Sequence, residues 1–251
     1  MPSKIPLSVV VITKNEEANL KSCLESVRWA LEIVIVDDAS TDKTLEIAQG
    51  FSDRIFVRKM DIEGRHRNWA YAQARHPWVL SLDADERVTP ELQQELEDTI
   101  KNPGDCSAFT IPRRNYIGKR WIQYGGWYPS PQLKVFKRAD FQWEEAEVHP
   151  RAFVKGNTGH LKSDLIHYSY KDYADFISKM NKQTTLEAAK WVRDRRKMGL
   201  GRALWRTFDR FMRSFLRKKA YKDGFAGLMV AIFAGLYQIF SYAKYREMKE
   251  N

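Results

Sequence analysis

Cysteine is scarce in this chain of 251 residues, which contains only Cys23 and Cys106. Two cysteines cannot form a disulfide framework, and no C-x-x-C or Cys/His spacing suggests a zinc site. The first residues precede an apolar run that is too short for a secretory signal. A protein of a reducing compartment is therefore expected.

Glycine-rich phosphate motifs are absent as well. No G-x-G-x-x-G follows the first apolar run at residues 7–12, and no G-x-x-x-x-G-K-[ST] occurs anywhere in the chain. These motifs hold the phosphates of dinucleotides and nucleoside triphosphates. The sequence therefore disfavours a dinucleotide oxidoreductase and a P-loop enzyme.

Positive charge is confined to one segment. The chain has a net charge of +10, and residues 190–222 alone contain 13 basic and two acidic residues. The remainder is close to neutral. The basicity therefore describes what this segment contacts rather than what the whole protein binds.

Strand and helix patterns alternate over the first hundred residues. Apolar runs at 7–12, 33–36, 55–57 and 78–82 predict strands, and helical spacing follows each of them. Pro90 stands where a first-turn proline opens a helix. This order predicts an α/β fold with a mostly parallel sheet flanked by helices.

Polar clusters follow three of these strands, at residues 13–17, 37–38 and 83–85. Ligands of open parallel sheets bind in the crevice at the carboxyl ends of the strands, so the clusters are expected to share one site. Asp83 and Asp85 suit Mg²⁺ or Mn²⁺, which prefer oxygen ligands. The alternative is that one of them caps the next helix.

Three sequence blocks carry a resemblance to a known family. SVVVITKNEEANL, EIVIVDDASTDKT and RNWAYAQARHPWVLSLDADERVTPEL occur in this order within residues 7–100 and resemble family 2 glycosyltransferases of the GT-A fold. VHPRAFV, GHLKSDLIHYSY and DGFAGLMVAIFAGLYQIFSYAKYRE are similar to a bacterial subgroup that includes the lipopolysaccharide core β-glucosyltransferases.

This resemblance implies a domain plan. A Rossmann-like GT-A catalytic domain is expected at residues 1–170, with a nucleotide-sugar-binding half at 1–105 and an acceptor half at 106–170. Residues 171–251 are expected to form a helical, basic and apolar extension that associates with a membrane.

The resemblance also implies roles for individual residues. Asp85 is expected to face a divalent cation, Mn²⁺ or Mg²⁺, and His149 is a second candidate for the metal or the acceptor. The donor nucleotide is expected to contact Thr13, Asn15, Glu16, Asp37, Asp38, Arg67, Asn68 and Asp83.

The implied reaction is an inverting transfer, in which an acceptor hydroxyl displaces the diphosphate and loses its proton to a carboxylate. Related sequences often carry His-Glu where this chain has His149-Pro150. The candidates for the base are therefore Glu145 and Glu147, which lie nearby in FQWEEAEVHP.

The basic segment carries an amphipathic pattern. Leu204, Phe208, Phe211 and Phe215 follow helical spacing, and residues 224–243 contain no charge. A membrane surface, a nucleic acid or a partner helix can bind such a pattern. We favour peripheral attachment to an anionic leaflet, while the uncharged stretch can also be a buried helix or a membrane span.

The sequence thus predicts a glycosyltransferase on the inner face of the cytoplasmic membrane. Its donor is expected to be a nucleotide sugar with a uridine diphosphate carrier, and its acceptor a glycan or lipid-linked molecule of cell-envelope biosynthesis. The alternatives are a nucleotidyltransferase with the same acidic metal site and a basic nucleic-acid-binding protein. We expect no nucleic-acid partner, because the basic residues avoid the predicted crevice.

Overall fold

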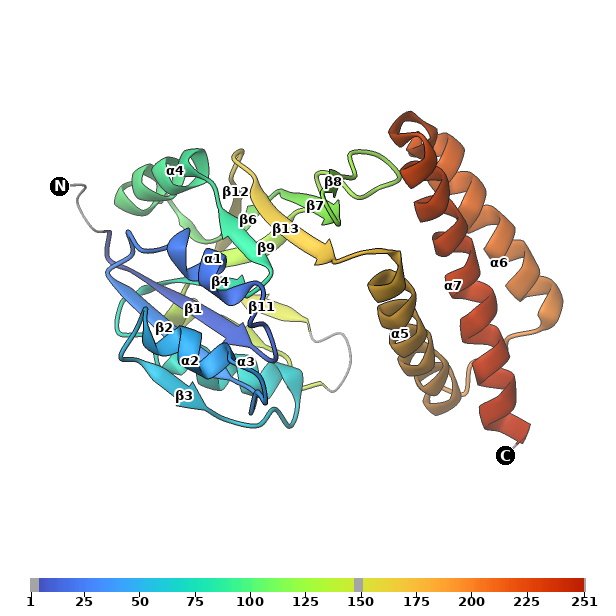
Figure 1. Ribbon diagram of the computed structural model, residues 1–251, viewed down its shortest axis with the longest axis horizontal. Coiled ribbons are helices and arrows are strands. Elements are labelled where there is room, and N and C mark those ends of the chain that lie inside the picture. Colours follow the sequence, from blue (N-terminus) through green and yellow to red (C-terminus); the bar gives the residue numbers. More distant parts are fainter. Residues whose placement is uncertain (1–4, 147–150, 251) are drawn as a thin grey trace. The chain divides into compact units, whose positions relative to one another are not determined.

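The computed structural model describes residues 5–146 and 151–250. The chain forms two compact units (Figure 1). The first contains the residues up to Arg113 together with Pro131–His167, and the second contains Arg114–Ser130 together with the chain from Tyr168 onward.

The first unit is built on a seven-stranded sheet with the order β12-β6-β9-β4-β1-β2-β3. Strand β9 runs antiparallel to both of its neighbours, whereas the other pairs are parallel. The predicted mostly parallel α/β sheet is therefore confirmed. Its strands are β1 (Leu7–Thr13), β2 (Glu32–Asp37), β3 (Ile55–Val57), β4 (Trp78–Asp83), β6 (Cys106–Ile111), β9 (Gln132–Lys137) and β12 (Asn157–His160).

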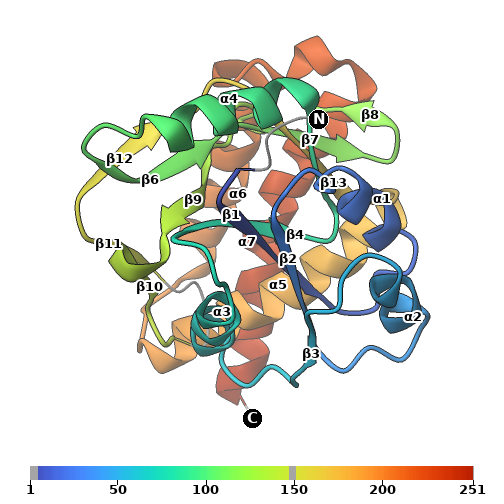
Figure 2. The same cartoon turned by 90° about the vertical axis from the view of Figure 1, so that its left-hand side faces the viewer.

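Helices cover both faces of this sheet (Figure 2). Alternate residues of a strand point to opposite faces, so Val9 and Val11 join one apolar cluster while Val10 joins another. The first cluster includes residues of α1 and α4, and the second includes residues of α3. The helices are α1 (Leu20–Glu25), α2 (Thr44–Gln49), α3 (Glu63–Ala72) and α4 (Pro90–Lys101).

The cap of α4 separates the two interpretations of the acidic residues after β4. The Thr89 side chain accepts a hydrogen bond from Leu92 N at 3.1 Å, and Pro90 occupies the first turn. The short strand β5 (Glu86–Val88) intervenes between β4 and this helix. Asp83 and Asp85 therefore do not cap α4.

Short strands complete the first unit. β5 pairs antiparallel with residues Leu165–His167 at the start of β13 (Leu165–Tyr170). After the single turn η1 (Arg138–Asp140), β10 (Phe141–Trp143) pairs antiparallel with β11 (Ala152–Val154). These antiparallel pairs differ from the parallel pairing that dominates the main sheet.

The second unit is mainly helical. Helix α7 packs against both α5 and α6. Gly227 allows its close approach to the preceding turn, because a Cβ there would overlap the backbone oxygen of Ala220. The elements are β7 (Arg113–Ile117), β8 (Arg120–Trp121), α5 (Tyr173–Arg193), α6 (Leu200–Met212), η2 (Arg213–Arg217), η3 (Ala220–Asp223) and α7 (Phe225–Glu250).

Helix α7 is long and apolar enough to cross a membrane, and 50% of its most apolar window is buried within the protein. Other apolar side chains of this unit are exposed: Phe208 on α6 is 56% exposed and Phe225 at the start of α7 is 68% exposed. Leu204 and Trp205 on α6 are also more than half exposed, and exposed apolar side chains that gather along one helix are typical of an interaction surface.

Candidate active site

A cavity of about 410 Å³ lies at the carboxyl ends of β1, β2 and β4. The register of these strands aligns Thr13 with Asp37 and Ile12 with Asp83, so their ends meet at one edge of the sheet. Helix α3 supplies the remaining wall. The lining residues are Ile12, Thr13, Lys14, Glu16, Asp38, Met60, Glu63, His66, Arg67, Asp83, Ala84 and Asp85.

Asp38 is fixed by hydrogen bonds on both carboxylate oxygens. Its Oδ2 accepts from Lys14 Nζ at 2.8 Å, and its Oδ1 accepts from Met60 N at 2.7 Å. Burial opposes ionisation, but these hydrogen bonds outweigh it and hold the pKa of Asp38 below its usual value. An ionised, immobile acceptor therefore faces the cavity.

Asp83 lies between two cations. Lys134 Nζ on β9 donates to Asp83 Oδ2 at 2.7 Å, and Arg67 Nη2 lies 3.4 Å from Asp83 Oδ1. Burial opposes ionisation of Asp83, but Lys134 and Arg67 hold its pKa well below the usual range. Lys134 also donates to the buried Glu86 at 2.7 Å, so a single ammonium group links two carboxylates.

Asp85 has a different environment. Its Oδ2 lies 3.4 Å from Nε2 of His167, whereas its Oδ1 is buried and has no hydrogen-bond partner among the described residues. An unpaired buried carboxylate oxygen costs free energy unless a ligand satisfies it. Asp85 therefore fits a divalent cation that takes its other ligands from water and phosphate.

No group of three or more His, Cys, Asp and Glu side chains within residues 5–146 and 151–250 could hold a metal by itself. Mg²⁺ is commonly held by one or two carboxylates together with substrate phosphates. Asp85 suits this arrangement, with Asp83 close by in sequence but already bonded to Lys134.

His66 and Thr13 leave further polar atoms without partners. Both ring nitrogens of the buried His66 and the hydroxyl of Thr13 have no hydrogen-bond partner in the described parts of the chain. Burial, aided by the charge of Arg58, lowers the pKa of His66, so a neutral imidazole lines the cavity. These atoms can bond to a polar ligand without displacing an internal contact.

Two residues expected at the nucleotide brace the loops instead of lining the cavity. Asp37 is buried and its Oδ2 accepts from Ser40 N at 2.8 Å. Asn15 Oδ1 accepts from Thr41 N at 2.8 Å, and Asn15 has a left-handed backbone with φ of 52°. Asn15 thereby connects the loop after β1 to the loop after β2, whereas Asp37 holds the start of the second loop.

Asn68 does not line the cavity either. It bonds to the backbone of Trp143 twice, since its side chain donates to Trp143 O at 2.9 Å and accepts from Trp143 N at 2.8 Å. Gly64 permits this approach of α3 and β10, because a Cβ there would overlap the backbone oxygen of Glu144. Asn68 therefore positions the segment that carries the candidate base.

Of the two candidates for the base, Glu145 is described. Its carboxylate is about half exposed, lies 3.0 Å from Arg65 Nε, and does not line the cavity at the strand ends. Glu147 lies outside the described residues, as does the candidate metal ligand His149.

Sequence reasoning did not assign a role to Lys134, Glu86, His66 or Lys14. The sequence does contain an indication that Lys134 is paired, because this cation stands between apolar residues in the strand QLKVFK. A charge inside an apolar strand is retained only when it is paired. The partner itself lay 51 residues away and could not be identified from that pattern.

Residues 8–155 match the description "Glycosyl transferase family 2", and this segment is more than half of the chain. The chain belongs to this family. The resemblance stated from the sequence is thereby confirmed, and the cavity at the strand ends lies within the matched segment.

One similar protein is the lipopolysaccharide core biosynthesis glycosyltransferase LpsC of Rhizobium meliloti. It is 28% identical over 256 residues, which cover 97% of this chain and 93% of LpsC. The poly(ribitol-phosphate) β-N-acetylglucosaminyltransferase TarS of Staphylococcus aureus is 32% identical over 171 residues, which cover 63% of this chain and 30% of TarS.

Solved structures are also similar. Residues 1–349 of Staphylococcus aureus TarS in complex with UDP give a TM-score of 0.48 at 16% identity, with 98% of this chain and 90% of that chain covered. Glucosyl-3-phosphoglycerate synthase of Mycobacterium tuberculosis with Mn²⁺ and UDP-glucose gives 0.39 at 20% identity, with 43% of each chain covered.

Proposed function

We propose that this glycosyltransferase transfers a sugar from a UDP-sugar to a glycan or lipid-linked acceptor in lipopolysaccharide or related cell-envelope biosynthesis, with inversion at the anomeric carbon. The observation that carries the proposal is the cavity in which Asp38, Asp83 and Asp85 converge with unpartnered polar atoms. The similarity of nearly the whole chain to LpsC supports a glycan or lipid-linked acceptor of lipopolysaccharide biosynthesis.

Different residues of the cavity bind different parts of the donor. Asp38, held ionised by Lys14, and the open polar atoms of Thr13 and His66 are placed to bond to the base and ribose. Arg67 offers its guanidinium to the diphosphate side, next to Asp83. Since these groups are fixed before the donor binds, little free energy is lost in ordering them.

A divalent cation held at Asp85 would offset the negative charge that develops on the departing diphosphate. Lys134 and Arg67 offset the charge of Asp83 and Glu86, which limits the repulsion between the acidic wall and the phosphates. The neutral His66 can donate a hydrogen bond without adding charge.

The acceptor hydroxyl must lose its proton to a carboxylate. Glu145 and Glu147 remain our candidates for this base, and Glu145 is anchored by Arg65 on α3. The helix that supplies Arg65 also supplies His66 and Arg67. The anchor therefore links the position of the candidate base to the donor cavity.

We further propose peripheral attachment to the inner face of the cytoplasmic membrane. The exposed apolar side chains of α6 and the start of α7 support it, together with the exposed basic residues that follow α6, Arg217, Lys218 and Lys219. Basic residues near an anionic leaflet contribute about 1 kcal/mol each. This attachment would bring the enzyme to acceptors that are seated in the membrane.

The donor site is tested by isothermal titration of the full chain with UDP, with and without Mn²⁺. We expect binding that Mn²⁺ strengthens and that Asp85→Ala weakens at least about tenfold, which is a loss of about 1.4 kcal/mol. Asp98→Ala removes an exposed carboxylate on α4 and serves as the control.

Binding that is indifferent to both Mn²⁺ and Asp85 would refute the proposed donor site. Turnover of a nucleoside triphosphate, with no transfer from any UDP-sugar, would instead identify a nucleotidyltransferase.

A further inference from the structure

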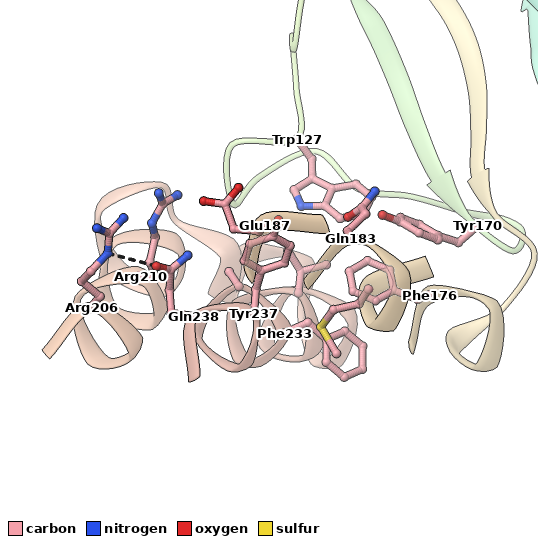
Figure 3. Close-up of a pocket in the computed structure, with 13 residues that line it drawn as sticks. Trp127, Tyr170, Phe176, Gln183, Glu187, Arg206, Arg210, Phe233, Tyr237 and Gln238 are labelled. Carbon is pink, nitrogen blue, oxygen red and sulfur yellow. Dashed lines mark hydrogen bonds between the residues drawn. The ribbon is translucent and has the colours of Figure 1, made fainter. Parts of the chain in front are cut away.

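A second cavity of about 410 Å³ lies within the helical unit (Figure 3). Helix α5 lines it with residues three or four positions apart, which form one helix face. The two arginines of α6 lie at one end and the ring of Tyr170 lies at the other. The lining residues are Trp127, Tyr170, Phe176, Met180, Gln183, Glu187, Arg206, Arg210, Val230, Phe233, Ala234, Tyr237 and Gln238. We call this cavity the helical groove.

Aromatic rings form the wall and floor at one end of the helical groove. Phe176 stacks on Trp127 with a centroid distance of 5.9 Å and on Phe233 with a distance of 4.6 Å. Tyr170 lies 4.2 Å from Phe176. Rings held in this way present a rigid apolar surface and lose little entropy when a ligand binds.

Planar polar side chains form the other end. Gln238 is only 5% exposed, and its Oε1 accepts from Arg206 Nε at 3.0 Å. Glu187 accepts from Trp191 Nε1 at 2.6 Å. These bonds fix the amide, guanidinium and carboxylate groups at the polar end before any ligand arrives, as in a preformed binding site.

Positive charge is in excess at this end. Burial lowers the pKa of Arg206, and the neighbouring charges of Arg196 and Arg210 lower it further, with Glu187 opposing them. A group with a net negative charge placed beside Arg206 and Arg210 would relieve this repulsion. A bidentate contact to a carboxylate or phosphate is the strongest interaction that an arginine makes.

The helical groove does not open on the exposed apolar surface of α6. At 3.6 residues per turn, Leu204 and Phe208 lie on the opposite side of α6 from Arg206 and Arg210. Both apolar side chains are more than half exposed. If that surface meets the membrane, the groove faces away from the lipid, toward polar ligands in water.

We propose that the helical groove binds a saccharide with a negatively charged substituent, as part of the acceptor of the proposed transfer. Sugar rings combine apolar faces with hydroxyl edges, which match the aromatic wall and the planar polar groups. The charged substituent, a phosphate or a carboxylate, pairs with Arg206 and Arg210. This inference deepens the proposed function and rests on it.

The test is binding of the full chain to an array of uronate-containing and phosphorylated oligosaccharides, printed beside the same saccharides without the charged groups. Titration with the best acidic oligosaccharide then measures affinity. We expect Arg210→Gln and Trp127→Leu each to weaken binding by about tenfold, the size of one strong contact. The control Arg217→Gln, an exposed basic residue outside the groove, is expected to stay within about twofold.

Three results would overturn the inference: no acidic oligosaccharide binds, Arg217→Gln weakens binding as much as Arg210→Gln, or Arg210→Gln impairs binding only to phosphatidylglycerol vesicles. The last result would identify a lipid site. UDP titration of the same proteins keeps the two proposals apart. If only the donor proposal is wrong, UDP does not bind but the acidic oligosaccharide still does.

Discussion

The ammonium group of Lys134 lies 2.7 Å from Asp83 Oδ2. The same nitrogen lies 2.7 Å from the buried Glu86, so one cation from β9 bridges two carboxylates that follow β4, with Arg67 beside Asp83 and Arg113 at 3.7 Å from Glu86. Removing the member that bridges a buried charged group leaves its partners under-compensated, and this costs more than the group itself contributes.

Lys134→Met is therefore expected to lower the free energy of unfolding by about 3–5 kcal/mol. Urea denaturation at neutral pH measures this loss. Lys137→Met, on the same strand, removes a lysine that lies over the Trp78 ring and is expected to cost about 1 kcal/mol or less. Equal losses in the two variants would contradict the role assigned to Lys134, whereas partial recovery in Lys134→Met/Glu86→Gln would support it.

His66 makes stability depend on pH. Because burial lowers its pKa below the unfolded value of about 6.5, the unfolded chain binds more protons as the pH falls below that value. The contribution of His66 is thus complete above about pH 6.5 and falls as the medium becomes more acidic. We expect His66→Gln to lose less stability than the wild type between about pH 7 and pH 5, measured by urea denaturation. Parallel curves would contradict a neutral His66.

Gly64 allows β10 to lie close to α3. In Gly64→Ala the new Cβ would meet the backbone oxygen of Glu144, so the segment that carries Glu145 must move. Transfer activity is expected to fall by about a hundredfold, as for other small misplacements of reacting groups. Gly50→Ala is the matched control, because its Cβ would meet nothing nearer than 3.5 Å. Wild-type activity in Gly64→Ala would refute this coupling.

The base is tested by replacing neighbouring carboxylates one at a time. Glu145→Gln or Glu147→Gln is expected to reduce turnover by about 10²–10⁴-fold while UDP binding is retained. Release of UDP from UDP-sugars in the presence of a lipopolysaccharide acceptor gives the rate. Glu144→Gln is the control, since Glu144 pairs with Arg151 at 3.1 Å. Normal turnover in both Glu145→Gln and Glu147→Gln would place the base elsewhere.

Membrane attachment is tested by flotation with phosphatidylglycerol vesicles. Burying one large aromatic side chain contributes about 1.5–3 kcal/mol, so Trp205→Glu or Phe208→Glu is expected to lower vesicle binding tenfold or more. Val57→Glu is the control, because Val57 is an equally exposed apolar residue of the other unit. Undiminished flotation of both α6 variants would exclude this surface.

The sheet and the acidic edge of the cavity could be predicted because both depend on local patterns. Apolar runs identify buried parallel strands, and parallel strands place their carboxyl ends together. Thr13, Asp38, Asp83 and Asp85 follow such runs, and the structure places all four around one cavity.

Which of two adjacent residues faces the cavity could not be predicted in this way. Asp37 and Asp38 are equivalent in the pattern, yet Asp37 bonds to Ser40 and only Asp38 lines the cavity. The order of strands in the sheet could not be predicted either, since β9 lies between β4 and β6 although it comes later in the chain than both. Lys134 is brought to Asp83 by this non-local pairing.

Because β9 comes late in the chain, the cavity cannot be completed until β9 has been synthesised. Strand β4 and its two acids leave the ribosome first, and the chain then contributes Arg114–Ser130 to the other unit before it returns at Pro131. The chain emerges from its N-terminal end, and a domain generally folds as a unit. A nascent chain that stops short of Lys134 thus carries Asp83 and Glu86 without their shared cation. The family 2 site becomes complete only when β9, from the second half of the chain, pairs with β4 and β6.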